Sequence, residues 1–254
     1  MKILEVKELD HYFGGLHAVD NLDFGLESGM IKAVIGPNGA GKTTLLNLIS
    51  GAISPSSGRV IFCGSDITRL QPFQIAKKGI IRTFQNLKLS RQMTVLENVM
   101  IGRHIMGHAG FLASMLKLPS ARKEEKLIRE EALNALDTLQ IADYKDSAVA
   151  SLPFGIQRRV EFARALACEP SLMLLDEPAS GLNLYETKEL ASLIREIRGQ
   201  GITILLVEHD MELVMDISDE IVVLNFGKKI AEGNSYSIQR NSEVIKVYLG
   251  EEDA

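Results

Sequence analysis

The segment Gly36 to Thr44, which reads GPNGAGKTT, brings together residue types that can hold phosphate groups. It satisfies the pattern Gly-x-x-x-x-Gly-Lys-Ser/Thr, whose glycines let the backbone curve tightly and turn its N–H groups toward an anion. Lys42 would bridge the β- and γ-phosphate oxygens, and the Thr43 hydroxyl would bind Mg²⁺, a hard cation that prefers oxygen ligands. A nucleoside triphosphate is therefore the expected occupant. The residues expected to line it are Gly36, Pro37, Asn38, Gly39, Ala40, Gly41, Lys42, Thr43 and Thr44.

Asp176 and Glu177 follow the apolar run Leu172 to Leu175. Such continuous runs are typical of strands buried on both faces, and two acids at the end of a buried strand are costly without a partner. Asp176 is placed to hold Mg²⁺ through water, and Glu177 to orient and activate the water that attacks the γ-phosphate. Acids that only make the strand end soluble are the alternative. The phosphate-binding loop in the same chain favours the catalytic interpretation.

His209 comes soon after a further apolar run, Ile202 to Val207. An imidazole can donate a hydrogen bond without carrying a permanent charge, so His209 is a candidate for contacting the γ-phosphate and sensing its departure. A lone histidine at a strand end is usually structural. Its place after a second apolar strand, downstream of the acid pair, favours the phosphate role.

Hydrophobic periodicity predicts the elements that must position these residues. A buried strand at Ile31 to Ile35 precedes the glycine-rich loop, and a helix that begins near Lys42 and ends around Gly51 follows it. The helix start would add partial positive charge for a phosphate. An apolar stripe between Leu190 and Ile197 predicts a crossover helix between the two later strands. Together these features predict an α/β fold, and the strand–loop–helix context speaks against a simple glycine-rich turn.

Other segments predict two additional lobes. Residues Ile3 to Glu27 read as short antiparallel strands with a turn at Gly14-Gly15, and another strand is expected at Arg59 to Phe62. The stretch from Met93 to Ala167 is predicted to be mostly helical. One face of this helical lobe would be lined by Ile128, Ala132, Ala135, Leu136 and Leu139. The remaining predicted elements are strands at Glu220 to Asn225 and Lys228 to Glu232 and a short helix near Val244 to Leu249.

The 254 residues carry a formal net charge of -5, with 46% hydrophobic and 24% charged residues. This is an ordinary globular composition, and the negative balance speaks against a nucleic-acid-binding protein. The amino terminus has no signal-peptide pattern, and no apolar run approaches the roughly 18 residues of a transmembrane helix. Cys63 and Cys168 lie far apart without metal-ligand spacing, which indicates a reduced cytosolic compartment.

The order of these motifs resembles that of the ABC transporter nucleotide-binding family, and the resemblance covers essentially the whole chain. Gln85, in RTFQN, resembles the family's glutamine loop, which contacts Mg²⁺ and the attacking water and responds to the membrane partner. Phe13, just before Gly14-Gly15, resembles the aromatic residue that stacks on adenine. Core packing of Phe13 and a role for Tyr12 in its place are the alternatives.

The segment Ser151 to Arg159, SLPFGIQRR, occupies the position of the family's signature sequence LSGGQ. Pro153 replaces the signature serine, but Gly155 is kept. The resemblance implies that Gly155 presents its N–H to nucleotide bound by an opposing subunit, and a simple helix start is the alternative. Asn183 stands where the family's D-loop usually has an aspartate.

The resemblance implies a single nucleotide-binding domain over residues 1–254, with a P-loop NTPase (RecA-like) core. An antiparallel β lobe would comprise about residues 1–30 and 55–70, and an α-helical lobe about residues 93–167. The segments RTFQN, MTVLENVMIGRH, ASGLN, VEHDMELVM and VIKVYLG are together similar to one branch of the family. That branch is the larger ATP-binding subunit of branched-chain amino acid importers.

Membership would imply hydrolysis of Mg-ATP between two cassettes closed head to tail, coupled to transmembrane permease subunits. The second cassette would be a related ATPase subunit or a second copy, and a solute-binding protein would take part indirectly. The chain would lie in the cytoplasm at the inner face of the plasma membrane.

Three alternatives remain open at the level of sequence. The first is the ATPase of a sister system for urea, short amides or lipopolysaccharide, with almost the same site. The second is a soluble ABC ATPase acting on ribosomes or DNA, but the tandem cassettes or long coiled coil of that class are not visible. The third is a generic phosphate-loop kinase or GTPase, which would not explain the order of Gln85, Gly155 and His209.

Overall fold

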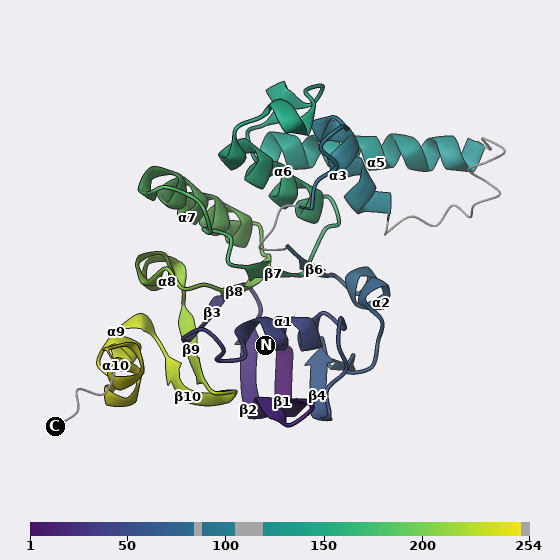
Figure 1. Ribbon diagram of the computed structural model, residues 1–254. Coiled ribbons are helices and arrows are strands. Elements are labelled where there is room, and N and C mark those ends of the chain that lie inside the picture. Colours follow the sequence, from purple (N-terminus) through teal and green to yellow (C-terminus); the bar gives the residue numbers. More distant parts are fainter. Residues whose placement is uncertain (84–87, 105–118, 250–254) are drawn as a thin grey trace. The chain divides into compact units, whose positions relative to one another are not determined.

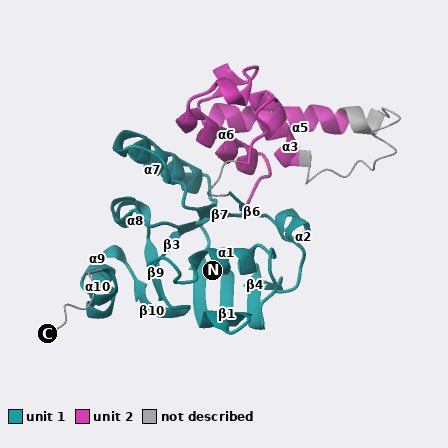
Figure 2. Cartoon of the chain, in the orientation of Figure 1, with its two compact units in different colours: residues 1–85, 171–254 teal, residues 86–170 magenta. Residues whose placement is uncertain are grey.

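The computed structural model describes residues 1–83, 88–104 and 119–249. The chain divides into two compact units, coloured separately in Figure 2. Unit 1 comprises Met1–Gln85 and Ser171–Ala254, and unit 2 comprises Asn86–Pro170. Unit 1 contains two β-sheets with flanking helices, and unit 2 is helical. The prediction of one nucleotide-binding domain over the whole chain stays a prediction.

The first sheet of unit 1 is antiparallel, with the strand order β2-β1-β4-β5. Its strands are β1 (Lys2–Phe13), β2 (Leu16–Glu27), β4 (Ser57–Phe62) and β5 (Ser65–Asp66). The sequence predicts short strands before Glu27, but β1 and β2 are each 12 residues long. Irregularities near Glu8 and Asn21, both with positive φ, interrupt the alternation of apolar residues and conceal one long strand as several short ones.

The second sheet has six strands in the order β10-β9-β3-β8-β7-β6 (Figure 1). Its five strands from β9 to β6 run parallel, and β10 pairs with β9 in antiparallel fashion. Every residue of β3, β7 and β8 is buried, as continuous apolar runs predict. The bounds are β3 (Ile31–Ile35), β6 (Ile80–Arg82), β7 (Leu172–Asp176), β8 (Thr203–Val207), β9 (Glu220–Asn225) and β10 (Lys228–Gly233).

Helices connect and cover these strands. The crossover helix predicted between β7 and β8 is α7 (Leu184–Gly199), and its apolar stripe is buried as expected. Helix α1 (Lys42–Ile49) begins where the phosphate-binding pattern ends. The other helices of unit 1 are α2 (Pro72–Lys77), α8 (Met211–Ile217), α9 (Ser235–Gln239) and α10 (Ser242–Leu249).

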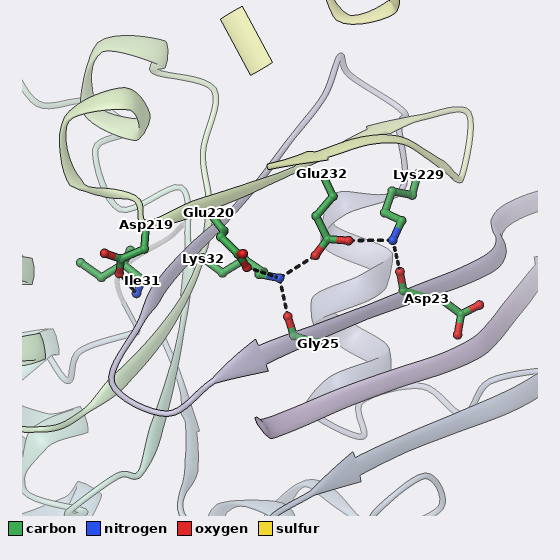
Figure 3. Close-up of polar contacts among 8 residues, drawn as sticks. All are labelled: Asp23, Gly25, Ile31, Lys32, Asp219, Glu220, Lys229 and Glu232. Carbon is green, nitrogen blue, oxygen red and sulfur yellow. Dashed lines mark hydrogen bonds and ion pairs between the residues drawn. The ribbon is translucent and has the colours of Figure 1, made fainter. Parts of the chain in front are cut away.

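A buried cation joins the two sheets of unit 1 (Figure 3). Lys32 lies on β3 and is only 2% exposed. Its ammonium contacts Glu232 Oε1 at 2.6 Å and Glu220 Oε2 at 2.9 Å, and it donates to the carbonyl oxygen of Gly25 on β2. Two carboxylates and a carbonyl therefore surround one desolvated charge, as burial of an ion requires.

The described residues of unit 2 form α3 (Val95–His104), α5 (Pro119–Thr138), α6 (Phe154–Leu166) and two short 3-10 turns, Ala142–Tyr144 and Val149–Ser151. The predicted apolar face of the helical lobe, from Ile128 to Leu139, lies on α5 and just after its end and is buried. Helix α3 begins with a reciprocal cap, because the Thr94 and Glu97 side chains each bond the other residue's backbone N–H. Across the described part of both units, no helix is long and apolar enough to cross a membrane.

Candidate functional site

The loop between β3 and α1 has a backbone that only glycine can adopt at two points. Gly36 has a φ of 153°, and a Cβ there would lie 2.2 Å from the carbonyl oxygen of Leu224. Gly41 has a φ of 100°, and a Cβ there would lie 2.4 Å from the carbonyl oxygen of Ala18. The loop is thus pressed between neighbouring strands at both ends, which fixes its curvature ahead of any ligand.

Lys42 is the first residue of α1 and is only 6% exposed. Its Nζ donates to the carbonyl oxygens of Gly36 at 2.6 Å and Pro37 at 3.0 Å, so the side chain folds back across the loop. Burial lowers the pKa of Lys42, while the charges of Glu177 and Asp176 oppose this shift. The ammonium is therefore held at the loop, near the two acids that the sequence analysis singles out.

Asp176 is the last residue of β7 and is 6% exposed. Its Oδ2 accepts from Arg82 Nη2 at 2.7 Å. Arg82 Nη1 also donates to Asn47 Oδ1 at 2.6 Å and Ser50 Oγ at 3.2 Å, both on or just after α1. The acid predicted to manage a metal is thus anchored to the helix that follows the phosphate-binding loop.

The sequence analysis does not identify Arg82 as a site residue. The only local signal is a cation directly after the apolar pair Ile80-Ile81, which reads equally well as the end of a strand. Arg82 reaches Asp176 because β6 pairs with β7, with Arg82 opposite Leu174. That pairing places Arg82 within reach of Asp176, the last residue of β7.

Glu177 and His209 come together at the ends of the neighbouring strands β7 and β8. His209 Nδ1 lies 3.8 Å from Glu177 Oε2, and the His209 side chain is 62% exposed. Glu177 has a φ of 45°, and its N–H donates to the carbonyl oxygen of Val207 at 2.8 Å. A strained backbone at a strand end is typical of residues held for function. The structure therefore brings together the two side chains that were predicted from separate segments.

Glu208 supports this arrangement from below the surface, and the sequence analysis gives it no role. It is fully buried, and its carboxylate accepts from the N–H groups of Ala179 at 2.7 Å and His209 at 2.9 Å. Burial raises the pKa of Glu208, and these backbone donors oppose the rise. The two donors tie the backbone after β7 to the backbone after β8.

A pocket of about 320 Å³ opens over the phosphate-binding loop. Phe13 lines it, whereas Tyr12 stacks on His17 with ring centroids 3.9 Å apart and is not among the lining residues. The side chain of Phe13 is about half exposed, so packing in the core does not account for it. The pocket is lined by Phe13, Leu16, His17, Ala18, Asn38, Gly39, Ala40, Gly41, Lys42, Thr43, Thr44, Glu177 and Phe226.

The donor set beside this pocket fits Mg²⁺. Thr43 is one of the residues that line the pocket, and Asp176 ends strand β7, so the side-chain ligand atoms that these two residues offer are oxygens. Hard oxygen donors in small number, completed by water and phosphate, are what Mg²⁺ takes in nucleotide sites.

Two predicted site residues cannot be assembled with this group. Gln85 lies outside the described residues. Gly155 belongs to unit 2, in the first turn of α6, where Pro153 is the N-cap. Backbone N–H groups of a first helical turn have no carbonyl partner within the helix, so that of Gly155 is of the type expected to meet a ligand. Its role stays a prediction.

Comparisons with known proteins identify relatives of this chain. A family model described as ABC transporter matches residues 19–180. Two high-affinity branched-chain amino acid transport ATP-binding proteins, BraF of Pseudomonas aeruginosa and LivG of Escherichia coli K12, are each 42% identical over 250 residues, with 98% of both sequences covered. A probable protein of the same description from Archaeoglobus fulgidus is 38% identical over 256 residues, covering 100% of this chain and 98% of that one.

Solved structures give the same result. A nucleotide-free ATP-binding cassette from an ABC transporter has a TM-score of 0.86 at 33% identity, covering 99% of this chain and 100% of that one. The ADP conformation of the cassette MJ1267 has a TM-score of 0.87 at 33% identity, with the same coverage. The predicted α/β fold of a P-loop NTPase, with its antiparallel and helical additions, is confirmed.

Proposed function

This chain belongs to the ABC transporter family, and we propose on that premise that it hydrolyses Mg-ATP to energise an importer of branched-chain amino acids. One observation carries the catalytic part of the proposal. A curved glycine loop with a buried lysine, two acids and a histidine lie together at the ends of three neighbouring parallel strands. Ligands of open α/β sheets bind at this edge.

The proposed division of labour follows from the contacts. The loop N–H groups and Lys42 bind the triphosphate, and Lys42 is already desolvated at the loop. Thr43 and Asp176, with Gln85, would hold Mg²⁺, which would supply positive charge to offset that of the phosphate oxygens. Phosphoryl transfer needs mainly positioning and charge stabilisation, so no covalent nucleophile is required.

Glu177 and His209 have different roles in the proposed reaction. Glu177 orients the attacking water and accepts its proton, because a carboxylate near the metal site can serve as a general base. His209 donates a hydrogen bond to the γ-phosphate. Its Nδ1 lies 3.8 Å from Glu177 Oε2, so both side chains can act at the same γ-phosphate. Phe13 stacks on the base from the rim of the pocket.

The partners follow from the family and from the relatives' names. Transmembrane permease subunits receive the motion, a second cassette closes the site through the segment around Gly155, and a solute-binding protein delivers cargo. The second cassette is a related ATPase subunit or another copy of this chain. The assembly lies at the inner face of the plasma membrane. The cargo rests on relatives named as branched-chain amino acid transport proteins that match over nearly the full chain.

Replacing Glu177 with glutamine tests the catalytic assignment. We expect Glu177→Gln to lower the rate of ATP hydrolysis by the assembled transporter at least about 100-fold, because a general base contributes that much or more. ATP affinity should be retained, since glutamine keeps the size and polarity of the side chain. Phosphate release and equilibrium ATP binding are the two measurements.

The matched control is Glu196→Gln, an exposed residue of the same type on α7. It should hydrolyse ATP at the wild-type rate. Undiminished hydrolysis by Glu177→Gln would remove Glu177 as the base. Uptake of labelled leucine by membranes that carry the permease subunits tests the cargo, and copurification of a permease for another solute would reassign it.

A further inference from the structure

Phe226 combines two unfavourable features that its packing does not offset. The residue is 82% exposed to solvent, and its backbone has a φ of 45°. A bulky residue rarely adopts a positive φ, and the strain it stores usually marks a functional constraint. Exposing a phenyl ring forfeits the free energy that burial would gain. The fold alone gives no reason to place a phenylalanine here.

The turn around Phe226 favours other residue types. Asn225 pairs with Lys228, so Phe226 and Gly227 form the two-residue turn of the β9–β10 hairpin. Both have positive φ, 45° and 82°, as in a type I′ turn. Asparagine, aspartate or glycine is preferred at the first of these positions, because each tolerates the left-handed conformation. Phenylalanine occupies a position that local structure would assign to a small residue.

The backbone of this turn is attached to the phosphate-binding loop. Gly227 N–H donates to the carbonyl oxygen of Ala40 at 3.1 Å. The Gly227 carbonyl oxygen accepts from Asp20 N–H, on β2, at 2.9 Å. The Phe226 ring is thus presented from a point fixed to both the loop and the antiparallel sheet.

The ring lines the pocket over that loop. Two separate hairpins supply the pocket's large apolar side chains, with Phe13 and Leu16 from the β1–β2 hairpin and Phe226 from the β9–β10 hairpin. The remaining lining comes largely from the phosphate-binding loop. A ligand that matches this lining has a charged phosphate end and a flat apolar end, as a nucleotide does.

We infer that Phe226 contacts the nucleobase of the bound nucleotide as a second aromatic side chain beside Phe13, and thereby contributes to the preference for a nucleotide over a base-free triphosphate. The inference rests on the proposed function, because it assumes that the pocket binds ATP. Phe226 adds to the affinity for the base that Phe13 also contacts, while the loop binds the phosphates.

Calorimetric titration of the full chain with Mg-ATP and with Mg-tripolyphosphate separates these contributions. Phe226→Ala is expected to weaken ATP binding about tenfold, the usual scale for loss of a base–aromatic contact. Tripolyphosphate affinity should stay unchanged, because that ligand has no base. Phe226→Tyr keeps the ring and should bind ATP like the wild type. Phe73→Ala removes another exposed phenylalanine, 58% exposed on α2 and outside the pocket lining, and should affect neither ligand.

The melting temperature of Phe226→Gly distinguishes a ligand-binding role of the ring from a structural role. Glycine adopts the positive φ without strain, so the variant should melt at or above the temperature of the wild type while its ATP binding weakens. A marked fall in Tm would mean that the ring supports the fold and would overturn the inference. So would unchanged ATP affinity in Phe226→Ala, or equal weakening of both ligands. A wild-type chain that binds neither ligand would instead contradict the proposed function.

Discussion

Arg82 and Asp176 lie 94 positions apart in the chain, yet their side chains meet at 2.7 Å. Both are less than a tenth exposed, so the ion pair is removed from water. A buried carboxylate is costly to leave without its cation. Asp176, the acid proposed to hold the metal, is therefore held in place by Arg82, a cation that no nearby sequence motif predicts.

Removing Arg82 should destabilise the protein. We expect Arg82→Ala to lower the free energy of unfolding by about 3–5 kcal/mol, the range for breaking a buried pair from one side. Arg82→Lys restores a charge without the planar fork and should recover part of the loss. Urea denaturation followed by circular dichroism measures both. If Arg82→Ala lowered the free energy of unfolding by less than about 1 kcal/mol, the ion pair would contribute no more than a surface pair, which would contradict its role in holding Asp176.

The sequence reveals those site residues whose signals are local. Lys42 follows a glycine pattern, and Asp176 and Glu177 end an apolar run, so neighbouring residues identify them. Arg82 and Phe226 join the site only through pairing of β6 with β7 and through a hairpin turn attached to the loop. No short segment of the sequence predicts strand pairing over such separations. The place of these two residues at the site is therefore seen only in the structure.

At the scale of elements, Asn183 gives α7 a defined start. Its side chain accepts from the N–H of Tyr185 and of Glu186, and the Glu186 side chain accepts from the Asn183 N–H. This reciprocal cap satisfies backbone groups that a helix start otherwise leaves unpaired. The departure from the family's usual aspartate therefore leaves the cap intact, since asparagine and aspartate cap equally well.

Substitutions of Asn183 should show how much its helix cap contributes to stability and whether aspartate can replace it. Asn183→Ala is expected to cost about 1 kcal/mol of stability, the usual loss for an N-cap, whereas Asn183→Asp should cost almost nothing. Differential scanning calorimetry of the full chain gives both values. Equal melting temperatures for Asn183→Ala and the wild type would show that the cap contributes no stability.

The elements found from sequence are those with a long or continuous pattern. Strands β3, β7 and β8 are uninterrupted apolar runs, and α7 carries a clear stripe. The sequence analysis does not identify β6, which has only three residues, or the short helices α2 and α8. Such short segments contain too few periods to distinguish helix from strand, and neighbouring strands stabilise them only after the sheet has formed.

At the scale of the molecule, Lys32 connects the sheet that carries the phosphate-binding loop to the sheet that carries Phe13 (Figure 3). Burial tends to raise the pKa of Glu232, but hydrogen bonds and charges from Lys229 and Lys32 outweigh it and hold that pKa below its usual value. A carboxyl with a depressed folded-state pKa adds stability above its unfolded pKa of about 4.3, and the stability is lost as the pH falls through the folded value.

Replacement of Lys32 should therefore change how the stability of unit 1 depends on pH. Lys32→Met fills the buried space but removes the cation, so we expect reduced stability at neutral pH and a smaller loss on acidification than in the wild type. Denaturant titrations at neutral pH and near pH 3.5 measure the difference. The control is Lys246→Met, at an exposed position on α10, which should follow the wild-type profile. Parallel pH profiles for Lys32→Met and the wild type would exclude this role for the Lys32 ion pairs.

Calorimetric titration of the purified chain with Mg-ATP, in the wild type and in Lys42→Ala, tests whether the loop around Lys42 binds the nucleotide. We expect saturable binding by the wild type and loss of most of that affinity in Lys42→Ala, because the ammonium that Gly36 and Pro37 hold at the loop is gone. Circular dichroism should show the same fold in both. Absence of binding by the wild type, or equal affinity in the two proteins, would show that Lys42 and its loop do not bind ATP.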